Sequence, residues 1–420
     1  MYYKEQLANG VRVVLHPMPH MSSVTIGVWI GAGSRYESES SNGISHFLEH
    51  LLFKGTEHRS CRELKEAIES KGGVLNAFTS EEMTCYWAKV IPQHLPVALD
   101  VLYDMVRAPL LQEEDIEKEK GVVLEEISMY VDLPMHYVHV LFSELLWPNQ
   151  PLGWLIVGKK EVVKNFNSHI LRQYMQGFYS AENVVVAMAG AITREEAGRL
   201  FSTFKDLPRG EKNTFTPARI EQKDPQVAVL PKETEQIHLC LGGRAFHRFH
   251  PDRYALLLLD TILGGNMTSR LFEELREKRG LTYEIRSSAQ GLNDTGLLVI
   301  SAGVALNKLD EVVELILQEL KRFKEEEVSS SELTQAKDYC RGQLLLTLEN
   351  TSSYMQWLGE HELCLSEIPT PEETMTRIEA VTQADIKRIA GELFVNENLC
   401  LAAIGPIKDK AKLKETFRMK

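Results

Sequence analysis

Two histidines and a glutamate in one short segment have the residue types and spacing that can hold a metal ion. His46 and His50 are four residues apart, so on a helix they lie on one face, one turn above the other. Two neutral imidazoles at this spacing can bind one Zn²⁺, and Glu49 beside them can take a proton from a metal-bound water. This H-x-x-E-H order is the inverse of the commoner H-E-x-x-H zinc-binding helix. A histidine pair on an apolar helix can also be a hydrogen-bonded feature of the core, so the motif alone leaves both interpretations open.

The segment that carries the motif is predicted to be a short, mostly buried helix. It follows Asn42-Gly43, a plausible helix start, and stops at Gly55, a plausible residue just past a helix end. Apolar residues recur between them at helical spacing: Ile44, Phe47, Leu48, Leu51 and Leu52. Apolar packing is therefore expected to fix the position of the two histidines.

Length, composition and charge limit what kind of protein this is. A chain of 420 residues with 44% hydrophobic and 25% charged residues is typical of a soluble globular protein with two or more domains. The net charge of −12 argues against nucleic acid or an anionic membrane as a partner. The start of the sequence shows no signal segment, no apolar run is long enough to span a bilayer, and six scattered cysteines indicate a reducing compartment. We therefore expect a cytoplasmic location.

Strands and helices are predicted to alternate through the first half of the chain. Strands are expected at 11–15, 24–30, 74–79, 83–90 and 183–190, and helices at 60–72, 95–106, 113–130, 168–179 and 193–204. The region that holds Pro134, Pro148 and Pro151 looks less regular. A proline-containing, charged stretch at 208–232 is the best linker candidate.

The order of elements recurs after this linker. The segment Ala181–Gly190 is echoed by Asn396–Gly405, and the helix near Leu95 is echoed near Leu309, at nearly the same offset. A long-period repeat of this sort marks duplicated structural units. We predict an α+β fold with two homologous domains, each a mainly antiparallel sheet packed with helices, around a clam-like cleft. The domains are expected at 1–207 and 233–420, joined by 208–232.

The duplication also predicts which half holds the metal. At the same offset, the counterpart of the histidine helix is Ala255–Leu263, which contains neither His nor Glu. The first half is therefore expected to carry the metal chemistry, and the second half to complete the substrate cleft.

A catalytic zinc needs a third protein ligand, and the helix at 113–130 offers candidates. Glu119 and Glu126 are seven residues apart, so they share one helix face. Two carboxylates facing a histidine pair suit one ligand and one supporting partner. An acidic face turned to solvent fits the same spacing, so the pattern leaves both interpretations open.

The motifs of the first half resemble one peptidase family. Gly33-Ser34-Arg35-Tyr36-Glu37, the stretch from Asn42 to His50 and Phe53-Lys54-Gly55-Thr56 are similar to the pitrilysin/insulinase (M16) family of zinc peptidases, in the branch of the mitochondrial processing peptidase β-subunit and its bacterial relatives. The likeness covers essentially the whole chain. It implies that Glu126 is the third ligand, after His46 and His50, and that Glu119 is the supporting carboxylate.

The resemblance extends to residues that contact substrate. Asn76, Ala77 and Phe78 match the family's edge strand, to which an extended peptide adds as a further strand. Arg276 and Tyr283 match the R-x6-Y segment of the second half, which implies contact with a substrate carbonyl and with the developing oxyanion.

These features together predict a zinc-dependent metalloendopeptidase with one Zn²⁺ per chain and Glu49 as general base. Its expected substrates are peptides or unfolded segments of proteins. Larger family members carry four such domains in one chain, which implies a homodimer for a chain with two. The alternative is a non-catalytic member of the family that serves as a structural or partner subunit.

Overall fold

The computed structural model describes residues 2–365, 367–407 and 409–419 and divides the chain into two compact units. Unit 1 consists of Met1–Ser128, Leu155–Thr216 and Leu345–Thr370, and unit 2 consists of Met129–Trp154, Pro217–Leu344 and Pro371–Lys420. Each unit holds one mainly antiparallel sheet packed with helices, so the expected α+β class with two similar halves is confirmed.

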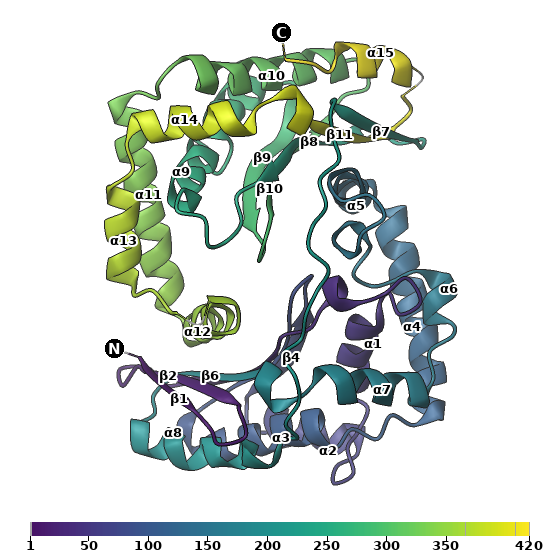
Figure 1. The fold of residues 1–420 in the computed structure, drawn as a ribbon, viewed down its shortest axis with the longest axis vertical. Coiled ribbons are helices and arrows are strands. Elements are labelled where there is room, and N and C mark those ends of the chain that lie inside the picture. The colour runs from purple at the N-terminus through teal and green to yellow at the C-terminus, as the bar shows by residue number, and fades with distance from the viewer. Residues whose placement is uncertain (1, 366, 408, 420) are drawn as a thin grey trace. The chain divides into compact units, whose positions relative to one another are not determined.

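The sheet of unit 1 has six strands, and β4 lies at its edge. Its order is β1 (Tyr3–Gln6), β2 (Arg12–Pro17), β6 (Val184–Gly190), β3 (Val24–Ile30), β5 (Thr84–Val90) and β4 (Val74–Thr79). All neighbouring strands are antiparallel except β2 and β6. Figure 1 shows helices α3 (Leu95–Arg107) and α8 (Arg194–Phe201) on one side of this sheet and α12 (Thr351–Leu365) on the other.

Helix α12 belongs to unit 1, although most of the helix before it and all of the helix after it in the chain belong to unit 2. It packs closely because small residues admit Trp29: a Cβ on Gly359 would lie 2.1 Å from the indole nitrogen. Met355 fills the space above Gly27 in the middle of the sheet. The carboxylate of Glu362, whose side chain is 0% exposed, pairs with Lys4 of β1, and a buried carboxylate needs such a partner.

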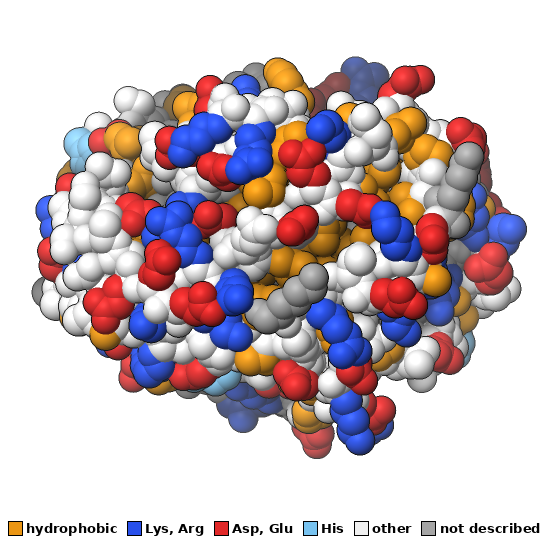
Figure 2. Space-filling view, turned by 90° about the horizontal axis from the view of Figure 1, so that it is seen from above, with side chains coloured by type: hydrophobic (Ala, Val, Ile, Leu, Met, Phe, Trp, Pro, Cys, Tyr) orange, Lys and Arg blue, Asp and Glu red, His pale blue; other side chains and the backbone are white. Residues whose placement is uncertain are grey.

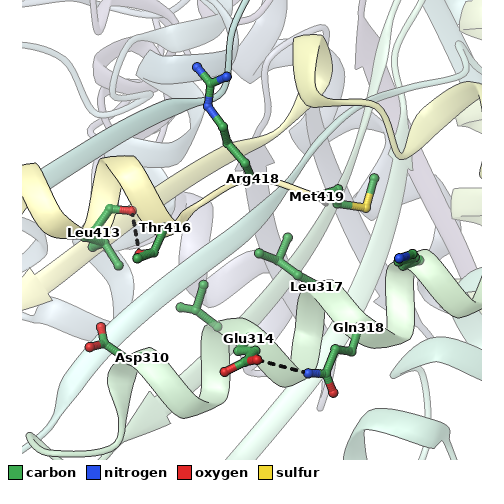
Figure 3. A pocket seen from close by; sticks show the side chains of 10 residues that line it. Asp310, Glu314, Leu317, Gln318, Leu413, Thr416, Arg418 and Met419 are labelled. Carbon is green, nitrogen blue, oxygen red and sulfur yellow. Dashed lines mark hydrogen bonds between the residues drawn. The ribbon is translucent and has the colours of Figure 1, made fainter.

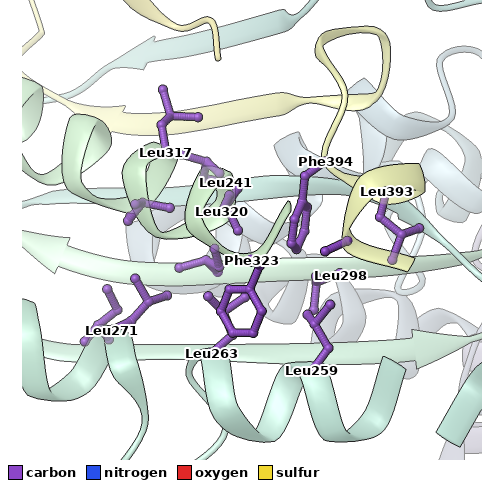
Figure 4. Packing of buried hydrophobic residues seen from close by; sticks show 14 of the residues in the cluster. Leu241, Leu259, Leu263, Leu271, Leu298, Leu317, Leu320, Phe323, Leu393 and Phe394 are labelled. Carbon is purple, nitrogen blue, oxygen red and sulfur yellow. The ribbon is translucent and has the colours of Figure 1, made fainter. Parts of the chain in front are cut away.

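The sheet of unit 2 repeats the strand order of unit 1 without the first strand. Its order is β7 (Gln226–Pro231), β11 (Cys400–Gly405), β8 (Ile237–Ala245), β10 (Gly296–Val304) and β9 (Thr282–Gly291), with β7 and β11 as the parallel pair. A cluster of leucines and phenylalanines joins this sheet to α9 (Arg253–Leu263), α10 (Leu309–Glu325) and α14 (Gln383–Leu393) (Figure 4). The predicted duplication is therefore visible in the order and direction of the strands.

A second helix shows the opposite exchange: it adjoins segments of unit 1 in the sequence but belongs to unit 2. Helix α5 (Pro134–Leu146) follows unit 1 in the chain but packs on the sheet of unit 2 through Val138 and Phe142. The sequence predicts an irregular stretch here, which is wrong, because Pro134 occupies the first helical turn, where its missing N–H breaks no hydrogen bond. The compact units therefore depart from the predicted sequential boundaries at 129–154 and 345–370.

The remaining helices surround the two sheets. Unit 1 also holds α1 (Ile44–Leu51), α2 (Cys61–Glu69), most of α4 (Glu113–Asp132), α6 (Lys160–Val163) and α7 (Ser168–Phe178), and the rest of the chain adds α11 (Ser330–Leu348), α13 (Pro371–Glu379) and α15 (Lys410–Thr416). In the described residues, no helix is long and apolar enough to cross a membrane. Basic and acidic side chains are interspersed on the face in Figure 2, so the net negative charge does not gather there in one patch.

Candidate active site

Helix α1 carries the histidine motif and is held at its N-terminus by a buried carboxylate. Glu37 accepts hydrogen bonds from the backbone N–H groups of Gly43 (2.7 Å) and Ser45 (2.9 Å) and from the side chain of Asn42 (3.2 Å). These bonds satisfy N–H groups that a helix start leaves without partners. Gly43 has φ +94°, and a Cβ there would lie 2.6 Å from the Cα of Gly158. The entry to the helix is therefore fixed by conformation and by hydrogen bonding.

The two histidines of α1 meet Glu126 of α4. The Nε2 atoms of His46 and His50 lie 3.6 Å and 3.5 Å from the two carboxylate oxygens of Glu126. One potential ligand atom from each of the three residues lies within 4.8 Å of the others, and no other such group is found in the described part of the chain. Two imidazoles and one carboxylate are a common ligand set for a catalytic zinc, which leaves a fourth position open.

Glu119 lies on α4 two helical turns before Glu126 and supports the same group of residues. It accepts a hydrogen bond from His50 Nδ1 at 2.9 Å, and its other oxygen pairs with the ammonium group of Lys54. Burial alone would raise the pKa of Glu119, but the hydrogen bonds with His50 and Lys54 lower it. With Nδ1 donating to an ionised carboxylate, His50 directs the lone pair of Nε2 toward a metal. The sequence did not predict Lys54 as part of the site.

The pKa values of the two histidines are shifted in opposite directions. Burial, assisted by neighbouring His50, lowers the pKa of His46 to about 3, so this imidazole is neutral at physiological pH. Its Nδ1 atom is buried and has no hydrogen-bond partner among the described residues. Burial lowers the pKa of His50, but Glu119 and Glu126 outweigh that effect and raise it. A metal must displace the proton that these carboxylates favour, so binding is expected to release protons.

Glu49 lies on α1 beside the ligands and is held by a residue of the edge strand. The hydroxyl of Thr79 donates a hydrogen bond to Glu49 Oε2 at 2.6 Å. Burial raises the pKa of Glu49, the bond from Thr79 opposes that shift, and the net pKa is above its ordinary value. A carboxylate with a raised pKa is a better proton acceptor, as general base catalysis requires. The sequence placed Glu49 correctly beside the histidines on α1, but gave no role to Thr79.

The predicted substrate residues Asn76, Ala77 and Phe78 lie on β4. This strand pairs with β5 on one side and ends the sheet on the other. The N–H of Ala77 donates a hydrogen bond to the side chain of Asn76 at 2.8 Å. Val74, nearly half exposed, begins the strand. An edge strand of this kind can accept a further strand through main-chain hydrogen bonds.

Arg276 and Tyr283 lie together in unit 2. Arg276 is in a π-helical segment (Phe272–Lys278), and its guanidinium carbon is 5.1 Å from the ring centroid of Tyr283 at the start of β9. The Tyr283 side chain is 78% exposed. The pair is thus available to a ligand, and its part in the reaction stays a prediction.

One cavity of unit 2 is lined by side chains of a different kind. A cavity of about 350 Å³ lies between α10 and the C-terminal segment and is lined by Leu317, Leu413 and Met419. Figure 3 shows Glu314 bonded to Gln318 on α10 and the hydroxyl of Thr416 bonded to Leu413. Its lining contains no histidine or cysteine, and none of its residues belongs to the His46–His50–Glu126 group.

Comparisons with known proteins agree with this arrangement. A family model described as insulinase (peptidase family M16) matches residues 12–159, and one described as peptidase M16 inactive domain matches residues 165–340. The uncharacterized zinc protease YmxG of Bacillus subtilis is 41% identical over 95% of this chain and 97% of its own length, and the uncharacterized zinc protease SCO5738 of Streptomyces coelicolor is 36% identical over 96% and 89%. Among solved structures, a protease from Helicobacter pylori has a TM-score of 0.89 at 23% identity, covering 97% of this chain and 99% of that chain, which shows the shared fold.

Proposed function

Because the chain belongs to the M16 (insulinase) family of peptidases, we propose that it is a zinc-dependent metalloendopeptidase that hydrolyses peptides or unfolded segments of proteins. The convergence of His46, His50 and Glu126 on one point carries this proposal. The three side chains come from two helices that are far apart in the sequence, and burial keeps the imidazole of His46 neutral, as a metal ligand must be.

The proposed roles of the residues follow from their contacts. His46, His50 and Glu126 bind one Zn²⁺ per chain, and Glu119 with Lys54 keeps His50 oriented. A zinc ion bound there supplies Lewis acidity, which polarises the scissile carbonyl and makes water a stronger nucleophile at neutral pH. Oε2 of Glu49 accepts the bond from Thr79, so Oε1 takes the proton from water and returns it to the leaving amine nitrogen.

We assign substrate binding to two further groups of residues. The free edge of β4 at Asn76, Ala77 and Phe78 binds an extended peptide through main-chain hydrogen bonds, which supports a broad choice of sequence. The exposed pair of Arg276 and Tyr283 binds a substrate carbonyl and stabilises the oxyanion. A homodimer and a cytoplasmic location stay predictions of the sequence.

The competing proposal is a non-catalytic structural or partner subunit. Such a protein has no use for a complete ligand set, and it has no use for a carboxylate with a raised pKa beside that set. Both features are present in unit 1. They favour the peptidase.

The deciding experiment compares wild type with Glu49→Gln, using metal analysis and cleavage of a fluorogenic peptide library. Glu49→Gln removes the proton acceptor and keeps the ligands, so we expect about one zinc per chain in both proteins and loss of turnover only in the variant. Glu125→Gln is a matched control, since Glu125 is exposed on α4 next to a proposed ligand. Wild-type protein without zinc, or a fully active Glu49→Gln variant, would overturn the proposal in favour of the partner subunit.

A further inference from the structure

A single hydrogen bond connects the edge strand of unit 1 to the proposed general base. Thr79 is the last residue of β4, and its hydroxyl donates to Glu49 Oε2 at 2.6 Å. A carboxylate that rotates freely presents its oxygens in many directions, whereas a hydrogen bond to one oxygen fixes the direction of the other. A bond between a hydroxyl and an ionised group is also stronger than a neutral one.

The turn that follows Thr79 is clamped by a loop before the histidine helix. The N–H groups of Ser34 and Arg35 donate to the carbonyl oxygens of Ser80 (3.2 Å) and Glu81 (2.8 Å). The guanidinium of Arg35 binds the carboxylate of Glu82 at 2.6 Å, and both side chains are buried. A buried ion pair of this quality resists displacement, because removing either partner leaves an uncompensated charge.

The same loop also contacts the turn closely through its backbone. A Cβ on Gly33 would lie 2.2 Å from the carbonyl oxygen of Ser80, so the backbones touch there. On its other side, Phe215 stacks on the Arg35 guanidinium with 3.9 Å between the carbon and the ring centroid. The turn is therefore held from the backbone and from the side chains.

The far end of this loop holds the helix that carries Glu49. Glu37 accepts hydrogen bonds from Gly43 and Ser45 at the start of α1. One segment, Gly33–Glu37, which we call the brace, thus fixes both the turn after Thr79 and the helix of Glu49. The resemblance to a peptidase family includes these residues without giving them a role, and the contacts supply one.

We propose that Thr79 is the positioning residue for Glu49 and that the brace sets the distance between them. This inference rests on the proposed function, because it assigns a role within the same reaction. Thr79 touches neither the metal ligands nor, by this proposal, the reacting atoms. It acts by holding Glu49 Oε2, so that Oε1 faces the water from which it takes a proton.

The first test is Thr79→Val, which keeps the shape of the side chain and removes the hydroxyl. We expect kcat to fall about tenfold or more, with KM changed by less than about twofold and zinc content unchanged. Thr79→Ser restores the hydroxyl and should recover most of kcat. Thr25→Val is a matched control, because Thr25 is a buried strand residue of the same sheet whose hydroxyl bonds to Thr351. It should lower stability without lowering kcat.

A crystal structure of Thr79→Val gives a readout that does not depend on turnover. We expect the Glu49 carboxylate to occupy more than one orientation in the variant and a single orientation in wild type. A single unchanged orientation, or an unchanged kcat, would overturn the positioning role.

A double-mutant cycle tests the brace. Glu82→Gln breaks the clamp on the turn, and if it acts through Thr79, the double variant Thr79→Val/Glu82→Gln should have the same kcat as Thr79→Val alone. Independent, multiplicative losses of kcat would refute the link between the brace and Thr79. Thermal melts of both single variants identify any loss that comes from unfolding.

Failure of this inference is distinguishable from failure of the proposed function. Wild-type protein that binds zinc and cleaves peptides, with a Thr79→Val variant of equal kcat, refutes only the positioning role. Wild-type protein that neither binds zinc nor cleaves peptides refutes the peptidase, and the positioning role with it.

Discussion

Helices α1 and α9 occupy corresponding places in the two units, but only α1 buries a histidine among its apolar residues. Each follows a middle strand, β3 or β8, and precedes the hairpin that ends its sheet. Helix α9 turns leucines such as Leu258 and Leu259 into the core of unit 2. Helix α1 buries Phe47 and Leu48 but also His46, which is only 9% exposed. The same framework therefore supports a mainly apolar buried face in one unit and a face with two candidate metal ligands in the other.

The comparison shows that the polar groups around α1 lie in surroundings that are unfavourable for their stability. Around α1, burial raises the pKa values of the carboxyl groups of Glu37, Glu49 and Glu126, so each is held in a place that disfavours its charge. His46 Nδ1 is buried without a partner among the described residues. Helix α9 has few such groups: Asp260 has a raised pKa, because burial outweighs its hydrogen bond from Ser287. We therefore expect unit 1 without metal to be less stable than its size suggests, and a bound metal to stabilise it.

The largest expected effect comes from making α1 resemble α9. His46→Leu replaces a ligand by an apolar side chain, so zinc affinity should fall by more than roughly 100-fold, and peptide cleavage should disappear. The same change removes a buried nitrogen without a partner, so the metal-free protein should gain about 1 kcal/mol in its free energy of unfolding. Metal analysis and thermal melts in a chelator measure both effects.

His50→Leu is the matched contrast for this prediction. It also removes a ligand, but it leaves Glu119 without the hydrogen bond from Nδ1, so the metal-free protein should lose stability. If the metal-free His46→Leu and His50→Leu variants changed stability in the same direction, the contrast between a strained and a supported histidine would be wrong.

The second largest expected effect is the loss of stability on shortening a buried side chain of α9. Leu259→Ala should destabilise the protein by about 3 kcal/mol, because it opens a cavity in a fully packed cluster. The residue belongs to unit 2, whereas all three proposed ligands belong to unit 1, so zinc content should not change. Denaturant unfolding with parallel metal analysis tests this, and a loss of zinc from the folded variant would show that α9 does more than pack.

The local parts of unit 1 could be predicted because their signals are local. The glycines around α1, the serine and glutamate that cap α2 and the polar turn after Thr79 each fix the end of an element within a few residues. Glu119 and Glu126 share a helix face through spacing alone. The choice between them as metal ligand came from the family resemblance and not from spacing.

The partners that cross the chain could not be predicted in the same way. Lys54 and Thr79 act through side chains that meet residues 65 or 30 positions away, and no periodicity reveals such a contact. The assignment of α5 to unit 2 and of α12 to unit 1 could not be predicted for a related reason. An apolar helix face fits either sheet, so composition does not show which sheet the helix covers.

The smallest expected effect concerns the contribution of one carboxylate of unit 2, Glu332, to the stability of the fold. Burial would raise the pKa of Glu332, but hydrogen bonds from Arg270 and Ser329 lower it to about 2. A carboxylate with a lowered pKa stabilises the fold above the unfolded pKa of about 4.3, and this stability is lost as the pH falls through 2. Glu49 and Glu126 of unit 1, whose pKa values are raised, have the opposite dependence.

Glu332→Gln should therefore cost about 1 kcal/mol at pH 7, a value reduced for the partial exposure of the pair, and almost nothing near pH 2. Glu326→Gln is the control, because Glu326 pairs with Arg322 on the surface and should contribute less at every pH. Urea unfolding at several pH values measures both. A loss for Glu332→Gln that stays constant down to pH 2 would mean that shape and not charge holds Arg270, and unit 2 would then not differ from unit 1 in its use of carboxylates.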